Sequence, residues 1–521
     1  MFTRSLATLA SLAASFATAI AAPEIAVRLD PALGDADRSG RLVVFLVGQN
    51  SGLDAQTRPI DGPFWASEQP LFGIDLKGLK PSEAVTIGDS ADGYPFKPGE
   101  LKPGRYRAQA GLISRRENSD WKRVAGNLFS DEADLVVNSE GKGSVTLTLA
   151  HRTEAPKRLP VPGIEWFEVP SALLSGFRKE PVVLRASVVL PLEYDPTRKY
   201  AAIYAVPGFG GDDRAAEYAA RERAESTGAA RELAKRTFLI VLDPEGPNGH
   251  TLFADSANNG PCARALIEEM IPALEKRYPL VPGPKGRMLK GHSSGGWSSL
   301  WLALMHPATF GATWSTSPDP VDFRKFQTVN IYDDKNFYSG GATDRPSFRE
   351  LDRGTGKPRV VMTIRREARQ EDVLGPGNTS GQQWDSWFAV FGPRDANGNP
   401  AALFDPVTGE IDRSVADAYR TFDIGSLVRS DPRRFLPLLR ANVHLLVGDA
   451  DSFYLNEAVA LLQEDTDRLR TEIPASGGTQ RNGGYIRIVP GLDHSTILRS
   501  AQARAAPAEM LEFLDAEPPA R

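Results

Sequence analysis

The chain has 521 residues, of which 41% are hydrophobic and 24% are charged, and its formal net charge is −5. This is the composition of a globular protein that is long enough for two or three domains with cores of their own. The negative charge is small and is not concentrated in blocks, which argues against a surface for nucleic acid or other polyanions. The 47 glycines and 40 prolines favour a loop-rich architecture with β-sheet over an all-helical one.

The first 21 residues have the pattern of a secretory signal peptide. Arg4 supplies a positive charge, residues 6–20 are mainly Ala, Leu and Phe, and residues 19–21 form an A-x-A cleavage site. The apolar stretch is too short to span a bilayer, and no later segment has the roughly 20 apolar residues that a transmembrane helix needs. The single cysteine, Cys262, can form no intrachain disulfide. We therefore expect an exported protein, periplasmic or secreted, without a membrane span.

Residues 22–151 contain the patterns of short strands and turns. Residues 41–47 are an apolar, β-branched run, residues 103–109 alternate after a Pro-Gly turn, and residues 145–149 alternate with period two. No segment here has the periodicity of an amphipathic helix. We expect a small, immunoglobulin-like β-sandwich over residues 22–151, followed by a Pro-rich linker over residues 152–164.

From residue 165 to residue 521, strand patterns alternate with helix patterns. The predicted strands are 182–190, 200–206, 237–243, 287–290, 443–447 and 485–489, and the predicted helices are 215–235, 263–278, 294–306 and 433–440. Residues 237–243 are almost continuously apolar, as in a parallel strand that is covered on both faces. The alternation predicts an α/β fold with a mostly parallel sheet and helices on both faces. A long, irregular insertion at about 318–430 interrupts it.

One motif lies between a predicted strand and a predicted helix. Residues 291–295, Gly-His-Ser-Ser-Gly, match G-x-S-x-G, which in this context can hold the central Ser293 on a sharp turn as a nucleophile. Gly291 and Gly295 are needed because a side chain at either place would collide with the neighbouring strand or helix. The N-terminus of the helix favours developing negative charge, and Ser294 is placed to donate its backbone N–H to an oxyanion hole.

A serine nucleophile needs a base, and in this order of elements the acid and then the histidine should follow the serine. Of the six histidines, only His444 and His494 come after Ser293. His444 lies inside a predicted strand, where a core or sheet position is expected. His494 lies in a loop after the predicted strand 485–489, where an imidazole can reach the serine, so His494 is the candidate base.

The candidate acids are Asp449 and Asp451, which follow the predicted strand 443–447. Asp451 is preferred because it lies further past the end of the strand, although Asp449 stays open. The acid would accept the Nδ1–H of the histidine and stabilise the imidazolium. Asp493, next to the histidine, is expected to structure its loop.

A second oxyanion donor is expected from the Gly-rich loop at residues 206–212. Its glycines let the backbone approach a substrate closely, and Phe209 or Gly210 would supply the N–H. The loop lacks the G-x-x-x-x-G-K-[ST] pattern of a phosphate-binding loop.

Weaker signals concern the walls of the site and metals. His250 and Asn258 lie in a polar loop after a predicted strand and are candidates for contacting substrate, but a network of turns explains this loop equally well. Trp384 belongs to an aromatic group in the insertion that would form either a lid or acyl pocket, or the core of the insertion. Residues 395–399 resemble a calcium loop, but Gly stands at the fourth place and not the sixth. We expect an Asn-Gly turn there, and neither a metal nor a cofactor.

Four segments together resemble the putative-esterase branch of the α/β-hydrolases, which includes S-formylglutathione hydrolase (esterase D), enterochelin esterases, feruloyl esterases and mycolyltransferases. They are PGFGG at 207–211, GHSSGG at 291–296, GDADSF at 448–453 and GLDHS at 491–495. The resemblance covers roughly residues 165–515 and implies an α/β-hydrolase fold with Asp451 and His494 in the triad. A β-sandwich ahead of the hydrolase is similar to the enterochelin esterases.

Two departures from the family limit what the resemblance implies. The family often has His-Gly before its oxyanion turn, where this chain has Pro207-Gly208. The insertion is longer than in compact members, so their substrates cannot be transferred to this chain.

The sequence as a whole predicts an exported serine esterase acting on a small-molecule or carbohydrate-linked ester. Two other functions stay open: an acyltransferase that uses the same residues with an acceptor alcohol in place of water, and a non-catalytic protein that binds carbohydrate or a partner on a hydrolase scaffold.

Overall fold

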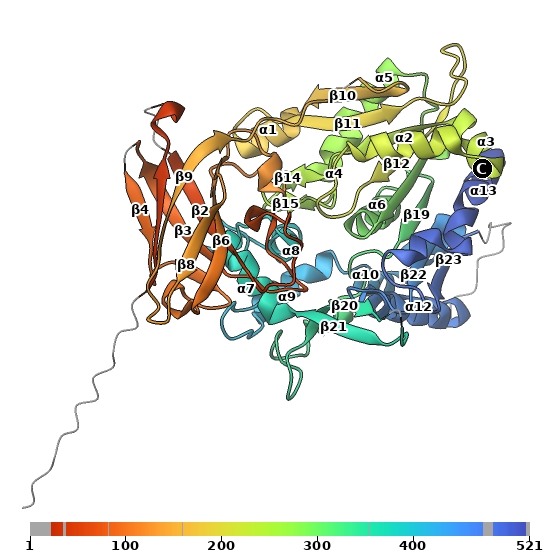
Figure 1. Ribbon diagram of the computed structural model, residues 1–521. Coiled ribbons are helices and arrows are strands. Elements are labelled where there is room, and N and C mark those ends of the chain that lie inside the picture. Colours follow the sequence, from red (N-terminus) through yellow and green to blue (C-terminus); the bar gives the residue numbers. More distant parts are fainter. Residues whose placement is uncertain are drawn as a thin grey trace, which may run out of the picture.

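The computed structural model describes residues 22–34, 38–81, 83–158, 160–352, 354–472 and 483–516 (Figure 1). The expected signal peptide, residues 1–21, lies outside these ranges and stays a prediction. Within the described ranges, no helix has both the length and the apolar character needed to cross a bilayer.

The N-terminal residues form a nine-stranded sheet in the order β4-β1-β9-β7-β6-β2-β3-β5, with β8 paired to β6. Its strands are β1 (Glu24–Leu29), β2 (Arg38–Gly48), β3 (Leu71–Leu79), β4 (Ala84–Ile87), β5 (Asp92–Tyr94), β6 (Gly104–Ile113), β7 (Leu128–Ser130), β8 (Ala133–Val137) and β9 (Ser144–Arg152). The three predicted strand patterns fall in β2, β6 and β9. Hydrogen bonds join all nine strands into one network, so the pairing does not by itself divide them into two sheets. The β-sandwich stays a prediction.

The C-terminal part of the chain forms a second sheet of eight strands in the order β10-β11-β13-β12-β18-β19-β22-β23. They are β10 (Ile164–Pro170), β11 (Val183–Val189), β12 (Ala201–Val206), β13 (Thr237–Leu242), β18 (Arg287–His292), β19 (Ala312–Thr316), β22 (Val443–Gly448) and β23 (Tyr485–Val489). The six strands from β13 to β23 run parallel, and β10 and β11 are antiparallel to their neighbours. This is the arrangement expected of an α/β-hydrolase-like fold.

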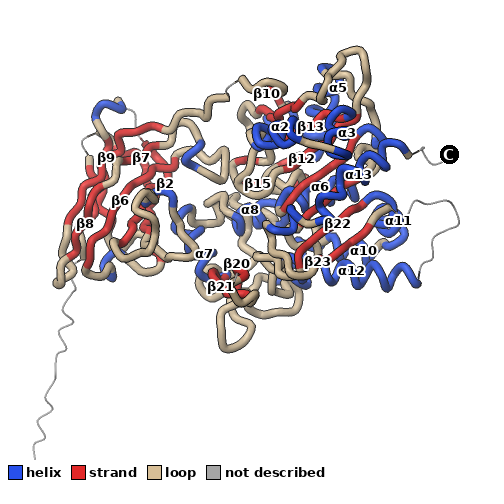
Figure 2. Tube along the Cα trace, turned by 45° about the vertical axis from the view of Figure 1, so that its right-hand side comes forward, coloured by secondary structure: helices blue, strands red, loops and turns tan. Residues whose placement is uncertain are grey.

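Buried side chains cover both faces of this sheet. On β12, Ala202 and Tyr204 belong to one core, whereas Ala201 and Ile203 belong to another on the opposite face. The helices outside the insertion are α1 (Ala172–Arg178), α2 (Ala215–Glu225), α3 (Gly228–Arg236), α4 (Cys262–Ala265), α5 (Ile271–Arg277), α6 (Ser294–Met305), α11 (Pro432–Asn442), α12 (Leu455–Glu472) and α13 (Ala501–Asp515). Figure 2 shows this mixed body beside the N-terminal domain, which consists mainly of strands and loops with a few short 3₁₀ turns.

Two predicted helices are interrupted. The helix expected at 215–235 is divided into α2 and α3 at Ser226-Thr227, before Gly228 with a φ of 55°. The helix expected at 263–278 contains a wide π turn at Leu266–Met270 before α5. Pro272 then stands in the first turn of α5, where its missing N–H costs nothing.

The insertion is more regular than the sequence indicated. It contains a hairpin of β20 (Pro346–Leu351) and β21 (Pro358–Thr363), and the helices α7 (Ile364–Leu374), α8 (Gln383–Phe391), α9 (Arg413–Ala418) and α10 (Ile424–Ser430). The four small strands of the loop at 243–261 are β14 (Glu245–Gly246), β15 (Gly249–His250), β16 (Asp255–Ser256) and β17 (Gly260–Pro261). Trp384 and its aromatic neighbours share one core with α6 and β22, so they pack the interior and form no lid.

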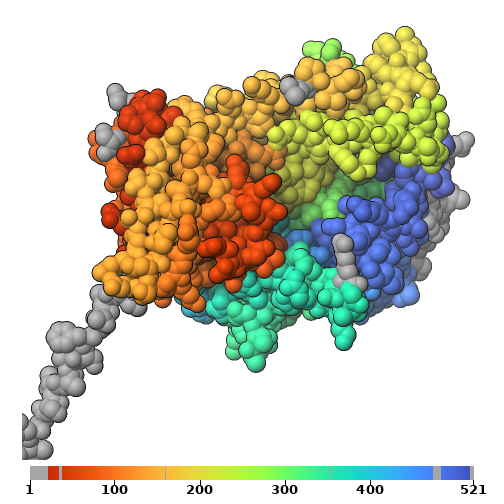
Figure 3. All heavy atoms as spheres, in the orientation of Figure 1, coloured from red at the N-terminus to blue at the C-terminus, as the bar shows by residue number. Residues whose placement is uncertain are grey.

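The N-terminal domain packs on the insertion through α7. Val373 and Leu374 of α7 lie in a core with residues of β2 and β3. The Arg116 guanidinium donates to the backbone oxygens of Leu374 (2.6 Å) and Ser380 (2.8 Å). Figure 3 shows a hollow in the surface where the N-terminal domain, the insertion and the part of the chain with the eight-stranded sheet meet.

Candidate active site

Ser293 lies on a strained turn between β18 and α6. Its φ of 58° and ψ of −127° are conformations that a residue with a side chain rarely adopts. A Cβ on Gly291 would lie 1.9 Å from the Gly295 oxygen, and a Cβ on Gly295 would lie 2.0 Å from the Val206 oxygen. The close approach of backbones therefore requires glycine at both places, as the motif predicted.

The loops after β22 and β23 bring an aspartate and a histidine together. The Nδ1 atom of His494 lies 2.8 Å from Oδ2 of Asp451, and the Asp451 side chain is fully buried. The other oxygen of Asp451 accepts the backbone N–H of Phe453 at 2.9 Å, which fixes the carboxylate. Asp449 instead accepts the N–H of Gly491 at 2.7 Å and holds the two loops together.

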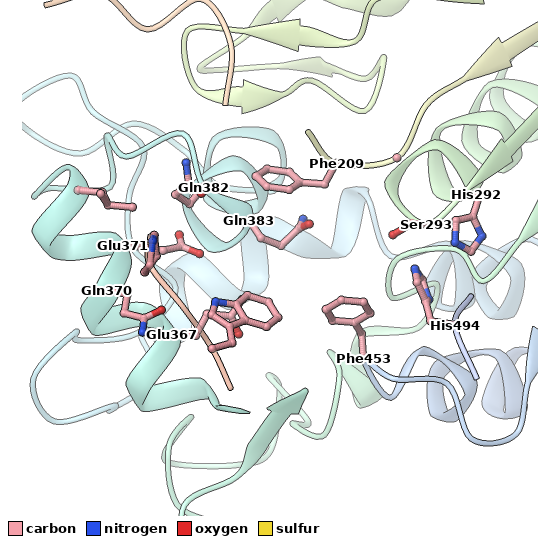
Figure 4. A pocket seen from close by; sticks show the side chains of 14 residues that line it. Phe209, His292, Ser293, Glu367, Gln370, Glu371, Gln382, Gln383, Phe453 and His494 are labelled. Carbon is pink, nitrogen blue, oxygen red and sulfur yellow. The ribbon is translucent and has the colours of Figure 1, made fainter. Parts of the chain in front are cut away.

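Ser293 and His494 line one cavity of about 340 Å³. Figure 4 shows the His494 ring beside the Ser293 hydroxyl, and the edge of Phe453 packs against this ring at a centroid distance of 4.9 Å. His494 thus pairs with a buried carboxylate and lines the cavity that Ser293 also lines.

The loop at residues 207–211 runs directly beside the serine. A Cβ on Gly208 would lie 3.3 Å from Cβ of Ser293, and Phe209 lines the cavity. Ser294 is the first residue of α6, where a helix has no carbonyl of its own to accept the N–H. Phe209 and Ser294 therefore both lie near Ser293, and their role as oxyanion donors stays a prediction.

Three predicted contact residues do not line this cavity. His250 is buried beneath the loop: its Nδ1 accepts from Leu252 N at 3.1 Å, so its Nε2–H donates to Pro207 O at 3.0 Å. Burial lowers the pKa of His250 to about 4, which keeps it neutral. Asn258 donates to the Gly392 oxygen at the end of α8, and Trp384 is 1% exposed within the aromatic core.

Two ionisable groups beside the serine, His292 and Asp319, were not among the predicted site residues. The ring of His292 lies 4.4 Å from that of His494, and burial together with this neighbour lowers the pKa of His292 to about 3. Asp319 is buried under the turn, where it accepts from Oγ of Ser294 (2.7 Å) and Nε1 of Trp387 (2.8 Å). Burial raises the pKa of Asp319 to about 6.

The far wall of the cavity comes from the insertion and the N-terminal domain. Its residues are Pro63, Trp65, Glu367, Gln370, Glu371, Leu374, Gln382 and Gln383. The only signal in the sequence was the recurrence of Glu367, Gln370 and Glu371 on one face of a helix. Nothing in the sequence showed that this face would meet the motif at residues 291–295.

No three His, Cys, Asp or Glu side chains within the described ranges are grouped so that they could hold a metal ion. His444 lies in β22, stacked on Trp314, as its position in a predicted strand indicated. Cys262 is buried, and burial raises the pKa of its thiol to about 12.

Comparison with known proteins gives one match to a family model. Residues 183–392 match the model of the Esterase family, described as "Putative esterase". No curated protein matches the chain.

Solved structures with some similarity include the following three. S-formylglutathione hydrolase from Agrobacterium tumefaciens is 14% identical, with a TM-score of 0.37, over 69% of this chain and 98% of that one. Est1E from Butyrivibrio proteoclasticus is 16% identical, with a TM-score of 0.32, over 64% of this chain and 96% of that one. A ferulic acid esterase from Anaeromyces mucronatus is 15% identical, with a TM-score of 0.30, over 69% of this chain and 92% of that one.

Proposed function

We propose that this chain, which matches the Esterase family model over residues 183–392, is a serine ester hydrolase that hydrolyses a carboxylic ester through Ser293, His494 and Asp451. The observation that carries the proposal is the connected set of these side chains. A fully buried carboxylate lies 2.8 Å from Nδ1 of a histidine that shares a cavity with the serine.

In the acylation step, Oγ of Ser293 attacks the ester carbonyl carbon while Nε2 of His494 takes the hydroxyl proton. Asp451 accepts the Nδ1–H and stabilises the imidazolium. The tetrahedral intermediate collapses by breaking the bond to the alcohol oxygen, which receives the proton from His494. Water then attacks the acyl-enzyme in the same way and releases the acid.

The oxyanion of each tetrahedral intermediate would accept the backbone N–H groups of Phe209 and Ser294. Such donors are aimed in advance at the charge that develops, and they commonly contribute 10²–10³-fold each to the rate. The hydrogen bond from His250 to Pro207 supports the loop that carries Phe209.

Wild-type protein and Ser293→Ala should be compared on p-nitrophenyl esters from acetate to octanoate. We expect wild-type turnover and a loss of about 10⁴-fold or more in the variant, since the other groups have no nucleophile to activate. Ser298→Ala is the matched control, because Ser298 lies on the same helix and its hydroxyl only bonds the Ser294 carbonyl oxygen. Equal turnover by wild type and Ser293→Ala would refute the proposal.

We also propose export to the periplasm or the medium, supported by the pattern of the first 21 residues. Cell fractionation followed by N-terminal sequencing should find a mature chain outside the cytoplasm that starts at Ala22. A cytoplasmic chain that retains residues 1–21 would contradict export without affecting the catalytic proposal.

A further inference from the structure

The cavity beside Ser293 has a second end that the steps of hydrolysis do not use. We call it the polar end, and its residues are Glu367, Gln370 and Glu371 of α7 with Gln382 and Gln383 at the start of α8. Figure 4 shows Glu367, Gln370 and Glu371 on the side of the cavity opposite Ser293.

The polar end is buried, which is unusual for such side chains. Glu367 is 4% exposed, Gln370 is 2% exposed and Glu371 is 5% exposed. Their spacing of three and four residues puts them on one face of α7, which a protein interior would normally fill with apolar groups. Polar groups in such a position cost free energy unless something hydrogen-bonds them.

Several of these atoms have no partner in the protein. Both the Nε2 and the Oε1 atoms of Gln370 and the Nε2 atom of Gln383 are buried without a hydrogen bond. The side chains of Ser347 and Trp384 face the Glu367 carboxyl and favour its charged form as hydrogen-bond donors. Buried polar atoms are nearly always paired in folded proteins, so this group is poised for a ligand.

The ionisable side chains of the polar end, Glu367 and Glu371, can carry only negative charge. Two carboxyl groups line the cavity, and no Lys or Arg is among its lining residues. Burial raises the pKa of Glu367 to about 7. It also raises the pKa of Glu371 well above its usual value, with Asp385 and Glu367 adding to the effect.

The carboxyl groups of Glu367 and Glu371 have different hydrogen-bond partners in the protein. Glu371 accepts the backbone N–H groups of Trp384 and Asp385, both at 3.1 Å, and so caps the start of α8. Glu367 makes no such bond to the backbone, and its partners in the protein are the side chains of Ser347 and Trp384. A bound cation would favour the ionised form of both groups and offset its desolvation, whereas a bound carboxylate or phosphate would gain no such charge pair.

We propose that the polar end binds a primary ammonium group, so that the preferred substrates are esters whose acyl or alcohol part carries an amine remote from the ester bond. An ammonium group has three N–H donors and no acceptor, so it can donate to the Glu367 carboxyl and to the unpaired Oε1 atom of Gln370. The aromatic side chains of Phe209 and Phe453 would contact the apolar chain between the two ends. This inference rests on the proposed esterase function.

The test compares isosteric esters that differ in a single terminal group. The acyl pair is ethyl 6-aminohexanoate against ethyl heptanoate, with monoethyl pimelate as the anionic member. The alcohol pair is 6-aminohexyl butanoate against heptyl butanoate. In at least one pair, we expect kcat/KM to be about tenfold higher for the ammonium ester than for the neutral ester, because a charge-assisted hydrogen bond contributes about this much. Monoethyl pimelate should be the poorest substrate.

Glu367→Gln should reduce this preference toward one, with Glu350→Gln as control. Glu350 lies on the exposed hairpin, where it pairs with Arg359, so its loss should leave the ratio unchanged. If Glu367→Gln does not fold, inhibition of the wild type serves instead: hexylamine should inhibit hydrolysis of p-nitrophenyl butyrate more strongly than 1-hexanol.

The two proposals fail in different ways. If the neutral members of both pairs are hydrolysed as fast as the ammonium members, or if folded Glu367→Gln keeps the wild-type ratio, the ammonium site is wrong and the esterase stands. If no ester is hydrolysed and Ser293→Ala behaves as the wild type, the esterase function itself is wrong.

Discussion

The two aspartates after β22 have nearly the same place in the sequence but different partners. Asp451 is fully buried against His494, whereas Asp449 bonds a backbone N–H at the surface of the next loop. A carboxylate can orient the imidazole and stabilise its charge only from the first of these positions. The chemistry of the site therefore depends on which aspartate the loop turns inward.

Asp451→Asn should lower kcat by about 10³–10⁴-fold, because an amide cannot stabilise the imidazolium or hold its tautomer. Asp449→Asn should lower it by less than about tenfold, since it weakens only one bond between loops. Steady-state kinetics on a p-nitrophenyl ester measure both. The opposite ranking would assign the acid to Asp449.

Asp319 should make stability depend on pH. Burial raises its pKa from 3.8 to about 6, so the folded state holds the proton more tightly than the unfolded state. The resulting stabilisation is fully present below pH 3.8 and is lost as the pH rises through about 6.

Asp319→Asn removes this titration, so its stability relative to the wild type should rise by roughly 2 kcal/mol between pH 4 and pH 7. Urea unfolding of both proteins across this range measures the difference. A difference that does not vary with pH would mean that Asp319 is not desolvated as described.

Much of the site was predictable at this scale, because Ser293, Asp451 and His494 lie in short motifs next to regular strands. His250, Asn258 and Trp384 were candidates for contacting substrate, with a network of turns or packing in the core of the insertion as the alternatives. Their partners are a carbonyl of the oxyanion loop, the end of α8 and an aromatic core, all distant in sequence. A single sequence gives no signal of such pairings.

At the scale of elements, the turn from β18 to α6 depends on close contact between backbones. The Cβ that Gly295 lacks would meet two backbone oxygens, those of Val206 at 2.0 Å and Pro207 at 2.6 Å. Neither can move without shifting β12, which also carries the loop with Phe209. The strand pair therefore sets the geometry of the nucleophile and the oxyanion loop together.

Gly295→Ala should destabilise the protein by about 3 kcal/mol or more, since backbone atoms cannot yield as side chains do. Gly176→Ala is the matched control, because it lies in α1 with nothing within 4 Å of an added Cβ. The control should be neutral or more stable by about 0.5–1 kcal/mol. Equal melting temperatures for the two variants would contradict the packing described here.

The strands and the elbow followed from the sequence because their patterns are local. The π turn before Pro272 did not, because only a fixed packing face decides whether a helix bends or widens at a proline. The helices of the insertion were not predicted. The face of α7 that is buried carries Glu367, Gln370 and Glu371, so its sequence lacks the apolar stripe by which a packed helix is usually recognised.

At the scale of the whole molecule, the N-terminal domain helps to build the cavity. Trp65 and Pro63 line it, and the Trp65 ring packs on Phe348 and Phe453 at 5.3 and 6.2 Å. Buried bonds from Arg41 and Arg116 to backbone oxygens near the end of α7 hold the domain there. The domain is thus a wall of the candidate active site.

Trp65→Ala should lower kcat/KM by about tenfold, mainly through KM, because it removes an aromatic wall from the cavity and leaves the catalytic groups in place. Val136→Ala, at an exposed position of the same domain, should have no effect. Wild-type kinetics for Trp65→Ala would instead indicate a domain with a separate role.

The central claim is that Ser293 is the nucleophile. Its most direct test is to treat the mature protein with a fluorophosphonate and to locate the adduct by mass spectrometry of its peptides. We predict one adduct per chain, on Ser293, and none on the Ser293→Ala variant. An unlabelled wild type, or an adduct on another residue, would contradict the account.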